Sequence, residues 1–155
     1  MAGTTHGAIN AETQLVPNTN KGGADVFVAK FGPQGELLWV VQFGSGADDF
    51  IEGITLSEQY GNAFLYIAGS TTGSMPVGLE QDPARQANVN AGRSDAYIAK
   101  IHSESGTIRW VKQFGTSGED SATGLATDSS GMVYVVGSTT GSIDGLTEAG
   151  GTRNA

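Results

Sequence analysis

The stretch Asp25-Val-Phe-Val-Ala-Lys-Phe31, followed by Leu38-Trp-Val-Val-Gln-Phe-Gly44, occurs twice in this sequence. The second occurrence reads Asp95-Ala-Tyr-Ile-Ala-Lys-Ile101 and Arg109-Trp-Val-Lys-Gln-Phe-Gly115. Because Asp25 and Asp95 lie 70 residues apart, the sequence has an internal period of about that length. Side chains alternate between two faces along 25–31, which is the pattern of a β-strand. The repeated phrase therefore predicts strands at matched places in two structural units.

Other phrases recur at nearly the same spacing. Tyr66-Ile-Ala-Gly-Ser-Thr-Thr-Gly73 is matched by Tyr134-Val-Val-Gly-Ser-Thr-Thr-Gly141, and an echo of this phrase, Ala2-Gly-Thr-Thr-His-Gly7, opens the chain as a loop. We therefore interpret residues 1–155 as one continuous repeat segment. Its divisions are repeat 1 over about 2–67, repeat 2 over about 68–135 and a partial third repeat over 136–155.

Each period contains four short strand signals separated by turn-forming residues. We letter them A, B, C and D by their expected order across one sheet, and the first predicted strand of the chain is a C strand. The predicted strands are 25–31 (C), 37–43 (D), 51–57 (A), 63–70 (B), 95–101 (C), 108–114 (D), 122–127 (A) and 132–138 (B). The 24 Gly residues and the 15% of charged residues also favour an all-β fold with many tight turns. A short helix is considered only at Gln81–Ala87.

Taken together, these phrases resemble the bacterial β-propeller repeats called SBBP, for seven-bladed β-propeller. The resemblance covers nearly all of 22–73 and 92–141. It implies that each repeat forms a propeller blade, a four-stranded antiparallel meander, and that the parent protein is bacterial and commonly secreted or attached to the cell surface. It implies no catalytic residues. The connection over 71–93 is longer than such repeats lead us to expect, and two repeats are too few for a ring of blades.

Aromatic residues at matched positions are predicted to pack in the core, because a single binding site seldom needs the same residue from every repeat. The Trp of each D strand is expected to lie between neighbouring blades. The predicted core aromatics are Trp39, Trp110, Phe43, Phe114, Tyr66 and Tyr134.

Acidic turns precede both A strands, at Asp48 and Asp49 and again at Glu119 and Asp120. Clustered carboxylates suit calcium, which takes six to eight oxygen ligands, so these four residues are weak calcium candidates. The simpler interpretation is that Asp49 and Asp120 bind backbone N–H groups within their turns. The Gly-Ser-Thr-Thr-Gly runs likewise have two interpretations. They cap strand ends, or they present hydroxyls to a sugar or peptide.

Several functions are disfavoured by what the sequence contains. The net charge of −8 would repel nucleic acid and anionic membranes. The chain has no Cys, and it shows no Gly-x-Ser-x-Gly elbow and no phosphate-binding loop. We therefore expect no enzyme activity and no cofactor other than possible calcium. No signal peptide and no apolar stretch of membrane-spanning length are present, so no membrane insertion is expected.

The favoured function is a binding or scaffolding module for protein interaction or self-assembly. Only the strands at 51–57, 63–70, 95–101 and 108–114 make a complete blade, whereas the first C and D strands should lack inner partners and the last A and B strands outer ones. Other copies joined head to tail, or neighbouring repeats, would complete them. The alternative is carbohydrate or surface binding by the acidic, hydroxyl-rich loop face, assisted by calcium.

Overall fold

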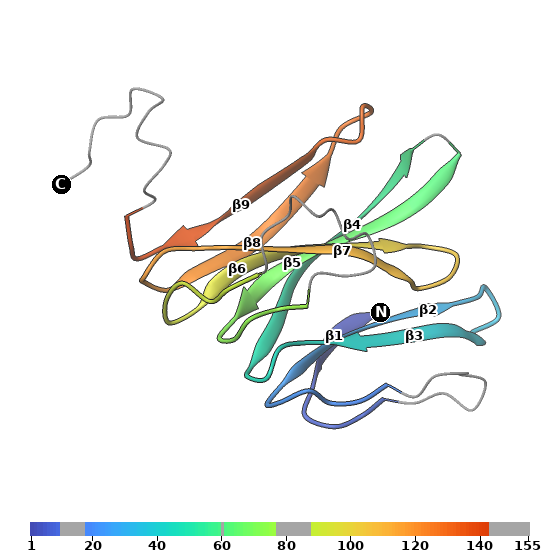
Figure 1. Ribbon diagram of the computed structural model, residues 1–155. Helices are drawn as coiled ribbons and strands as arrows, with labels where there is room; N and C mark the ends of the chain where they lie inside the picture. Colours follow the sequence, from blue (N-terminus) through green and yellow to red (C-terminus); the bar gives the residue numbers. More distant parts are fainter. Residues whose placement is uncertain (10–17, 60, 77–87, 143–155) are drawn as a thin grey trace.

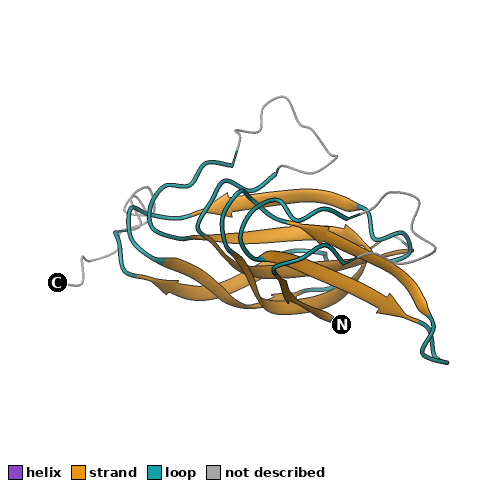
Figure 2. Cartoon of the chain, turned by 90° about the horizontal axis from the view of Figure 1, so that it is seen from below, coloured by secondary structure: helices purple, strands orange, loops and turns teal. Residues whose placement is uncertain are grey.

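The computed structural model describes residues 1–9, 18–59, 61–76 and 88–142, and this part of the chain consists of strands joined by turns and loops, with no helix (Figure 2). The predicted all-β fold is confirmed. The strands are β1 (Ala2–Thr5), β2 (Asp25–Phe31), β3 (Leu37–Phe43), β4 (Asp49–Gln59), β5 (Asn62–Thr71), β6 (Asp95–His102), β7 (Ile108–Phe114), β8 (Asp120–Thr127) and β9 (Val133–Thr139). The short helix considered at Gln81–Ala87 lies outside the described residues.

The strands form three separate antiparallel sheets that follow chain order (Figure 1). The first sheet is β1-β2-β3, the second is β4-β5-β6-β7, and the third is β8-β9. The second sheet therefore has all four positions A to D, the first has B, C and D, and the third has A and B. Such meanders are the expected form of propeller blades.

The start of the chain differs from the prediction. The sequence predicts that Ala2–Thr5 is part of a loop and that the first C strand has no inner partner. β1 instead pairs with β2, with Ala2 opposite Val28 and Thr5 opposite Asp25. The pairing of β5 with β6 places Ala68 opposite Ile98 and Thr71 opposite Asp95. β1 thus takes the place of a B strand, because its four residues repeat the end of β5.

The repeats match even in their irregularities. The C and D strands shift register between Lys30 and Phe31 in the first sheet and between Lys100 and Ile101 in the second. The turn that follows contains a glycine with positive φ in both cases, 87° at Gly35 and 69° at Gly106. This region of φ is strained for other residues, so glycine suits both turns. A residue in one repeat can therefore be compared directly with its counterpart in the next.

The main core lies between the first and second sheets. The first sheet contributes Val26, Val28 and Phe43, and the second contributes residues that include Ile67 and Tyr97. A smaller cluster joins the second sheet to the third. Its buried members are Ala68, Ala96 and Ala122, with Leu125 and Val135 partly buried against them. Burial stabilises each contact by about 25 cal/mol per Å² of apolar surface. The third sheet, whose buried contacts are small alanines, therefore gains less from its neighbour.

Trp39 is half-buried between the first and second sheets, as expected for a Trp between blades. Its indole N–H donates to the Ser103 carbonyl oxygen at 3.0 Å, and its ring lies against Gly106 of the same turn. Trp110, the counterpart in β7, instead packs against the Tyr66 ring of its own sheet, with 6.0 Å between ring centroids. The two tryptophans therefore occupy equivalent strand positions but differ in their contacts.

We predict that Trp39→Ala lowers the free energy of unfolding by about 2–4 kcal/mol, because it opens a cavity between two sheets. Trp110→Ala should cost less, because the described part of the third sheet has no C–D turn like the Ser103 turn that holds Trp39. Urea unfolding of both variants, followed by circular dichroism, measures the difference. Equal losses in the two variants would show that the contact with the Ser103 turn contributes nothing.

Candidate functional site: open sheet faces and the loop network

Equivalent residues differ sharply in exposure, and the difference marks where a neighbouring sheet is missing. Phe43 and Tyr66 are buried, with 4% and 2% of their surfaces exposed. Their counterparts Phe114 and Tyr134 are 47% and 59% exposed. The prediction that Phe114 and Tyr134 are core residues is therefore wrong for the described chain. Position in the repeat specifies which way a side chain points, but only an adjacent sheet can bury it.

The outer face of the third sheet is apolar and uncovered. Met132, Tyr134 and Val136 are all exposed on it, and they alternate with residues directed toward the second sheet. At the other end of the molecule, Phe31 and Leu38 of the first sheet are exposed. An apolar surface of this kind commonly marks an interaction site. The two exposed faces have different residues, so a contact that joins one face to the other face of a second copy would be heterologous.

Two hollows lie beside these incomplete sheets. The first, which we call the β9 hollow, has a volume of about 470 Å³ and is lined by residues that include Ala96, Phe114, Val135 and Gly137. The second, the β2 hollow, has a volume of about 420 Å³. Its lining includes Met1, Phe31, Ile54, Leu56 and Leu65.

A polar network that sequence reasoning missed fastens the loop before each C strand to the D strand. Asn18 donates to the Val40 carbonyl and accepts from the Gln42 backbone N–H. Asn88 makes the same two bonds, with Val111 and Gln113. The Gln side chains then donate to the buried Asp that begins each C strand. The phrases Asn-x-Asn-x-Gly at 18–22 and 88–92 share the repeat period, and this signal could have found the network.

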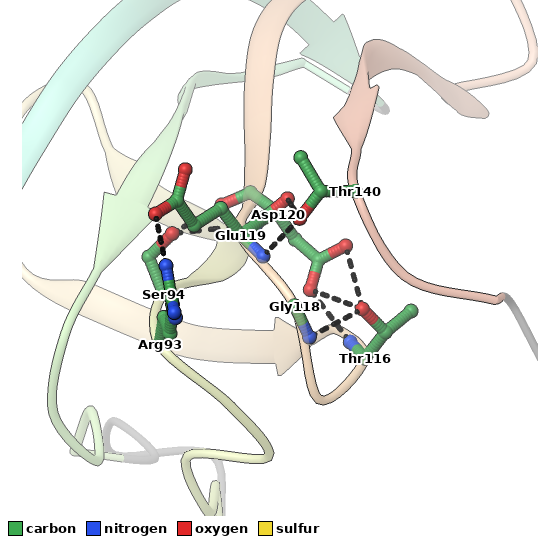
Figure 3. A network of polar contacts seen from close by, with 7 residues as sticks. All are labelled: Arg93, Ser94, Thr116, Gly118, Glu119, Asp120 and Thr140. Atoms are coloured by element: carbon green, nitrogen blue, oxygen red, sulfur yellow. Dashed lines mark hydrogen bonds and ion pairs between the residues drawn. The ribbon is translucent and has the colours of Figure 1, made fainter.

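The acidic turns are tied into the fold by hydrogen bonds, in line with the simpler of the two interpretations. Asp49 is fully buried and accepts from the Ser45 N–H and hydroxyl and from the Thr71 hydroxyl. Asp120 accepts from the Thr116 N–H and hydroxyl in the same way (Figure 3). Three donors around one carboxylate favour its charged form.

The neighbouring acidic residues and hydroxyls are also occupied. Asp48 accepts the Ala24 N–H at 2.8 Å, and Glu119 pairs with Arg93 at 3.4 Å (Figure 3). The Thr72 and Thr140 hydroxyls accept from the backbone N–H groups of Asp48 and Glu119. The structure thus uses these threonines as caps. Within the described residues, no group of three or more His, Asp and Glu side chains is arranged to hold a metal ion.

Burial and hydrogen bonds shift the pKa of the Asp in each acidic turn, upward for Asp49 and downward for Asp120. Burial raises the pKa of Asp49, against the bonds from Thr71 and Ser45, and the negative charge of Asp25 raises it further. A Cβ at Gly44 would lie 2.5 Å from Asp49 Oδ2 and 2.6 Å from Asp25 Oδ1, so the two carboxylates flank this glycine. For Asp120, which lines the β9 hollow, burial acts upward but the bonds from Thr139 and Thr116 together lower the pKa.

The fold is all-β, and its small antiparallel sheets have the form of propeller blades. Residues 109–144, which include most of β7 and all of β8 and β9, match the family model of the SBBP beta-propeller repeat. The resemblance seen in the sequence is therefore confirmed by a family match over this segment. No curated protein matches the chain. Among the described residues, none lies in a helix that is long and apolar enough to cross a membrane.

The contributions of Asp49 and Asp120 to folding stability should change in opposite directions with pH. A raised pKa means that folded Asp49 keeps its proton in a window, above the usual 3.8, where the unfolded chain has lost it. Stability contributed by this group therefore falls as pH rises through the window. For Asp120 the sign is reversed, because its pKa is lowered. Its contribution is present above the unfolded pKa and is lost as pH falls.

We accordingly predict that the stability deficit of Asp49→Asn shrinks from about pH 3 to pH 7, whereas that of Asp120→Asn grows. Asn does not titrate, so each variant reports the titration of the Asp that it replaces. Urea midpoints of wild type and both variants, measured across this pH range, give the two deficits. Parallel changes in the two variants would contradict the assignment of opposite shifts.

Proposed function

We propose that this chain is a non-catalytic β-propeller repeat module that acts by joining its incomplete sheets to further repeats, in other copies of itself or in neighbouring repeats. The observation that carries the proposal is the contrast between the complete second sheet and the two others. Among the described strands, β9 ends the third sheet with no C strand beside it, and β1 ends the first sheet with no A strand beside it. Free edges and uncovered apolar faces both recruit another chain.

Catalysis has little support from the site. An active centre needs an acid, a base or a nucleophile free to act on a substrate. The acidic residues of the turns instead hold backbone N–H groups and hydroxyls of their own chain. Sugar binding by the Ser/Thr-rich turns is less favoured for the same reason, because Thr72 and Thr140 already bond to the backbone. By resemblance, the module would operate in a secreted or cell-surface protein.

The proposal predicts concentration-dependent assembly that requires the outer face of β9. Val136 on this face and Val89 in a loop are 65% and 67% exposed. Val136→Lys should therefore leave the monomer fold intact and shift assembly to at least about ten-fold higher concentration, because a lysine buried in an interface is costly. Val89→Lys adds the same charge at a matched exposure and should assemble like wild type.

Light scattering over a concentration series measures assembly directly. A wild-type chain that stays folded and monomeric at all concentrations would overturn self-assembly. Equal weakening by Val136→Lys and Val89→Lys would mean that charge alone, not the β9 face, is responsible.

A further inference from the structure

We propose that the occupant of both hollows is a second copy of this chain, whose β2–β3 hairpin continues the third sheet beside β9, while β1 gives up its place on β2. This inference rests on the proposed function and specifies its partner and register. The interface between the first and second sheets already makes the same kind of contacts within one chain.

The β9 hollow corresponds to a space that is filled between the first two sheets. Tyr97 fills that space: its ring is fully buried with Val26, Phe43 and Ile67, and its hydroxyl donates to the Phe50 carbonyl at 3.0 Å. The counterparts of those three neighbours in the next repeat are the hollow residues Ala96, Phe114 and Val135. What the hollow lacks is an aromatic residue on a C strand. In a second copy, the C-strand residue equivalent to Tyr97 is Phe27, and its ring would fill the β9 hollow.

The β2 hollow lacks the complementary element, a full-length B strand. β5 spans Asn62–Thr71, whereas β1 covers only the equivalent of its last four residues. Ile54 and Leu56 on β4 are consequently 48% and 57% exposed. Met132, directly before β9, and Tyr134, on β9, are the exposed counterparts of Phe64 and Tyr66 in β5. These two side chains therefore fit the β2 hollow of another copy, over Ile54 and Leu56.

The tryptophans support the same arrangement. Trp39 has a carbonyl partner in the turn of the next sheet, but none of the described residues offers one to the indole N–H of Trp110. The counterpart of the Ser103 turn would be the Gly32–Gly35 turn of a second copy. Trp110 has a ring neighbour in Tyr66, and Tyr134 of a second copy would supply the equivalent neighbour to Trp39. Each tryptophan would then have both contacts.

The register follows from the pairing within the second sheet, where Tyr66 lies opposite Lys100 and Thr71 opposite Asp95. Translated by one repeat, Tyr134 of one copy lies opposite Lys30 of the next, and Val136–Thr139 lie opposite Asp25–Val28. Those same four β2 residues are now paired with Ala2–Thr5. β1 and β9 therefore compete for one edge, and the two cannot pair with it together.

β9 has the advantage in this competition, because it pairs over its whole length of seven residues and carries the side chains that fill the β2 hollow. With β1 released, each copy contributes eight of the nine strands in its described residues, which make two four-stranded sheets. The contact is heterologous, so three copies would close a ring of six sheets and four copies a ring of eight. In a single copy, β1 covers part of the β2 edge and therefore opposes assembly.

Register is tested by cross-linking, since the chain has no native Cys. Lys30→Cys and Tyr134→Cys chains are mixed at a concentration where wild type assembles, and oxidised. Facing Cβ atoms in a ladder lie about 4.5–5.5 Å apart, which permits a disulfide. We expect a mixed disulfide dimer as the main product. Lys21→Cys, which replaces an exposed loop lysine, is the matched control and should give little cross-link with Tyr134→Cys.

Competition by β1 is tested by weakening its pairing. A Cβ at Gly3 would approach the Phe27 ring to 2.9 Å, whereas a Cβ at Gly7 would meet nothing within 4 Å. Gly3→Val should loosen β1 and tighten association by about three- to ten-fold, because a larger fraction of chains then has a free β2 edge. Gly7→Val should match wild type.

The outcomes separate the two levels of the proposal. Growth in mass without the Lys30–Tyr134 cross-link would overturn this inference and leave self-assembly standing, whereas absence of any growth in mass overturns the proposed function itself. A cross-link that forms with unchanged association in Gly3→Val would overturn the role given to β1.

Discussion

The stability of each sheet depends on burying its two faces against neighbours, because a sheet of two to four strands has no core of its own. The first and second sheets satisfy this constraint for one another, and Val26, Ile67 and Tyr97 become fully buried between them. The third sheet has a neighbour on one side only. Its exposed outer residues follow from that asymmetry. Within the described residues, the β9 hollow lies where no C strand pairs with β9, and the β2 hollow lies where β1 is too short to be a full B strand.

Polar groups determine how the loops are held against this stack of sheets. Each C strand begins with a fully buried Asp, Asp25 or Asp95, and a Gln of the adjacent D strand donates to it. Buried carboxylates are tolerated only when they are hydrogen-bonded. The Asn of the preceding loop bonds to the backbone of the same D strand, so the loop and the two strands form one unit in both repeats. The carboxylates of this face are therefore structural groups in the described chain.

Sequence reasoning located the strands well where the repeat signal is complete. β2, β3 and β7 have the predicted bounds, because alternation and turn residues define them locally. It missed β1, since four residues in a strand position look like a loop unless the pairing partner is known. It also took Phe114 and Tyr134 for core residues, because exposure depends on whether an adjacent sheet is present. The acidic turns were interpreted correctly as bonding to the backbone, but the Asn18 and Asn88 contacts were overlooked.

The central claim is that a second copy completes the third sheet along β9. Hydrogen–deuterium exchange of the backbone amides, measured at concentrations below and above assembly, tests it most directly. The amides of β9 that face β2, and the amide of Phe31, should become protected on assembly, while those of β1 should become less protected. Assembly that leaves the protection of β9 and β1 unchanged would contradict it.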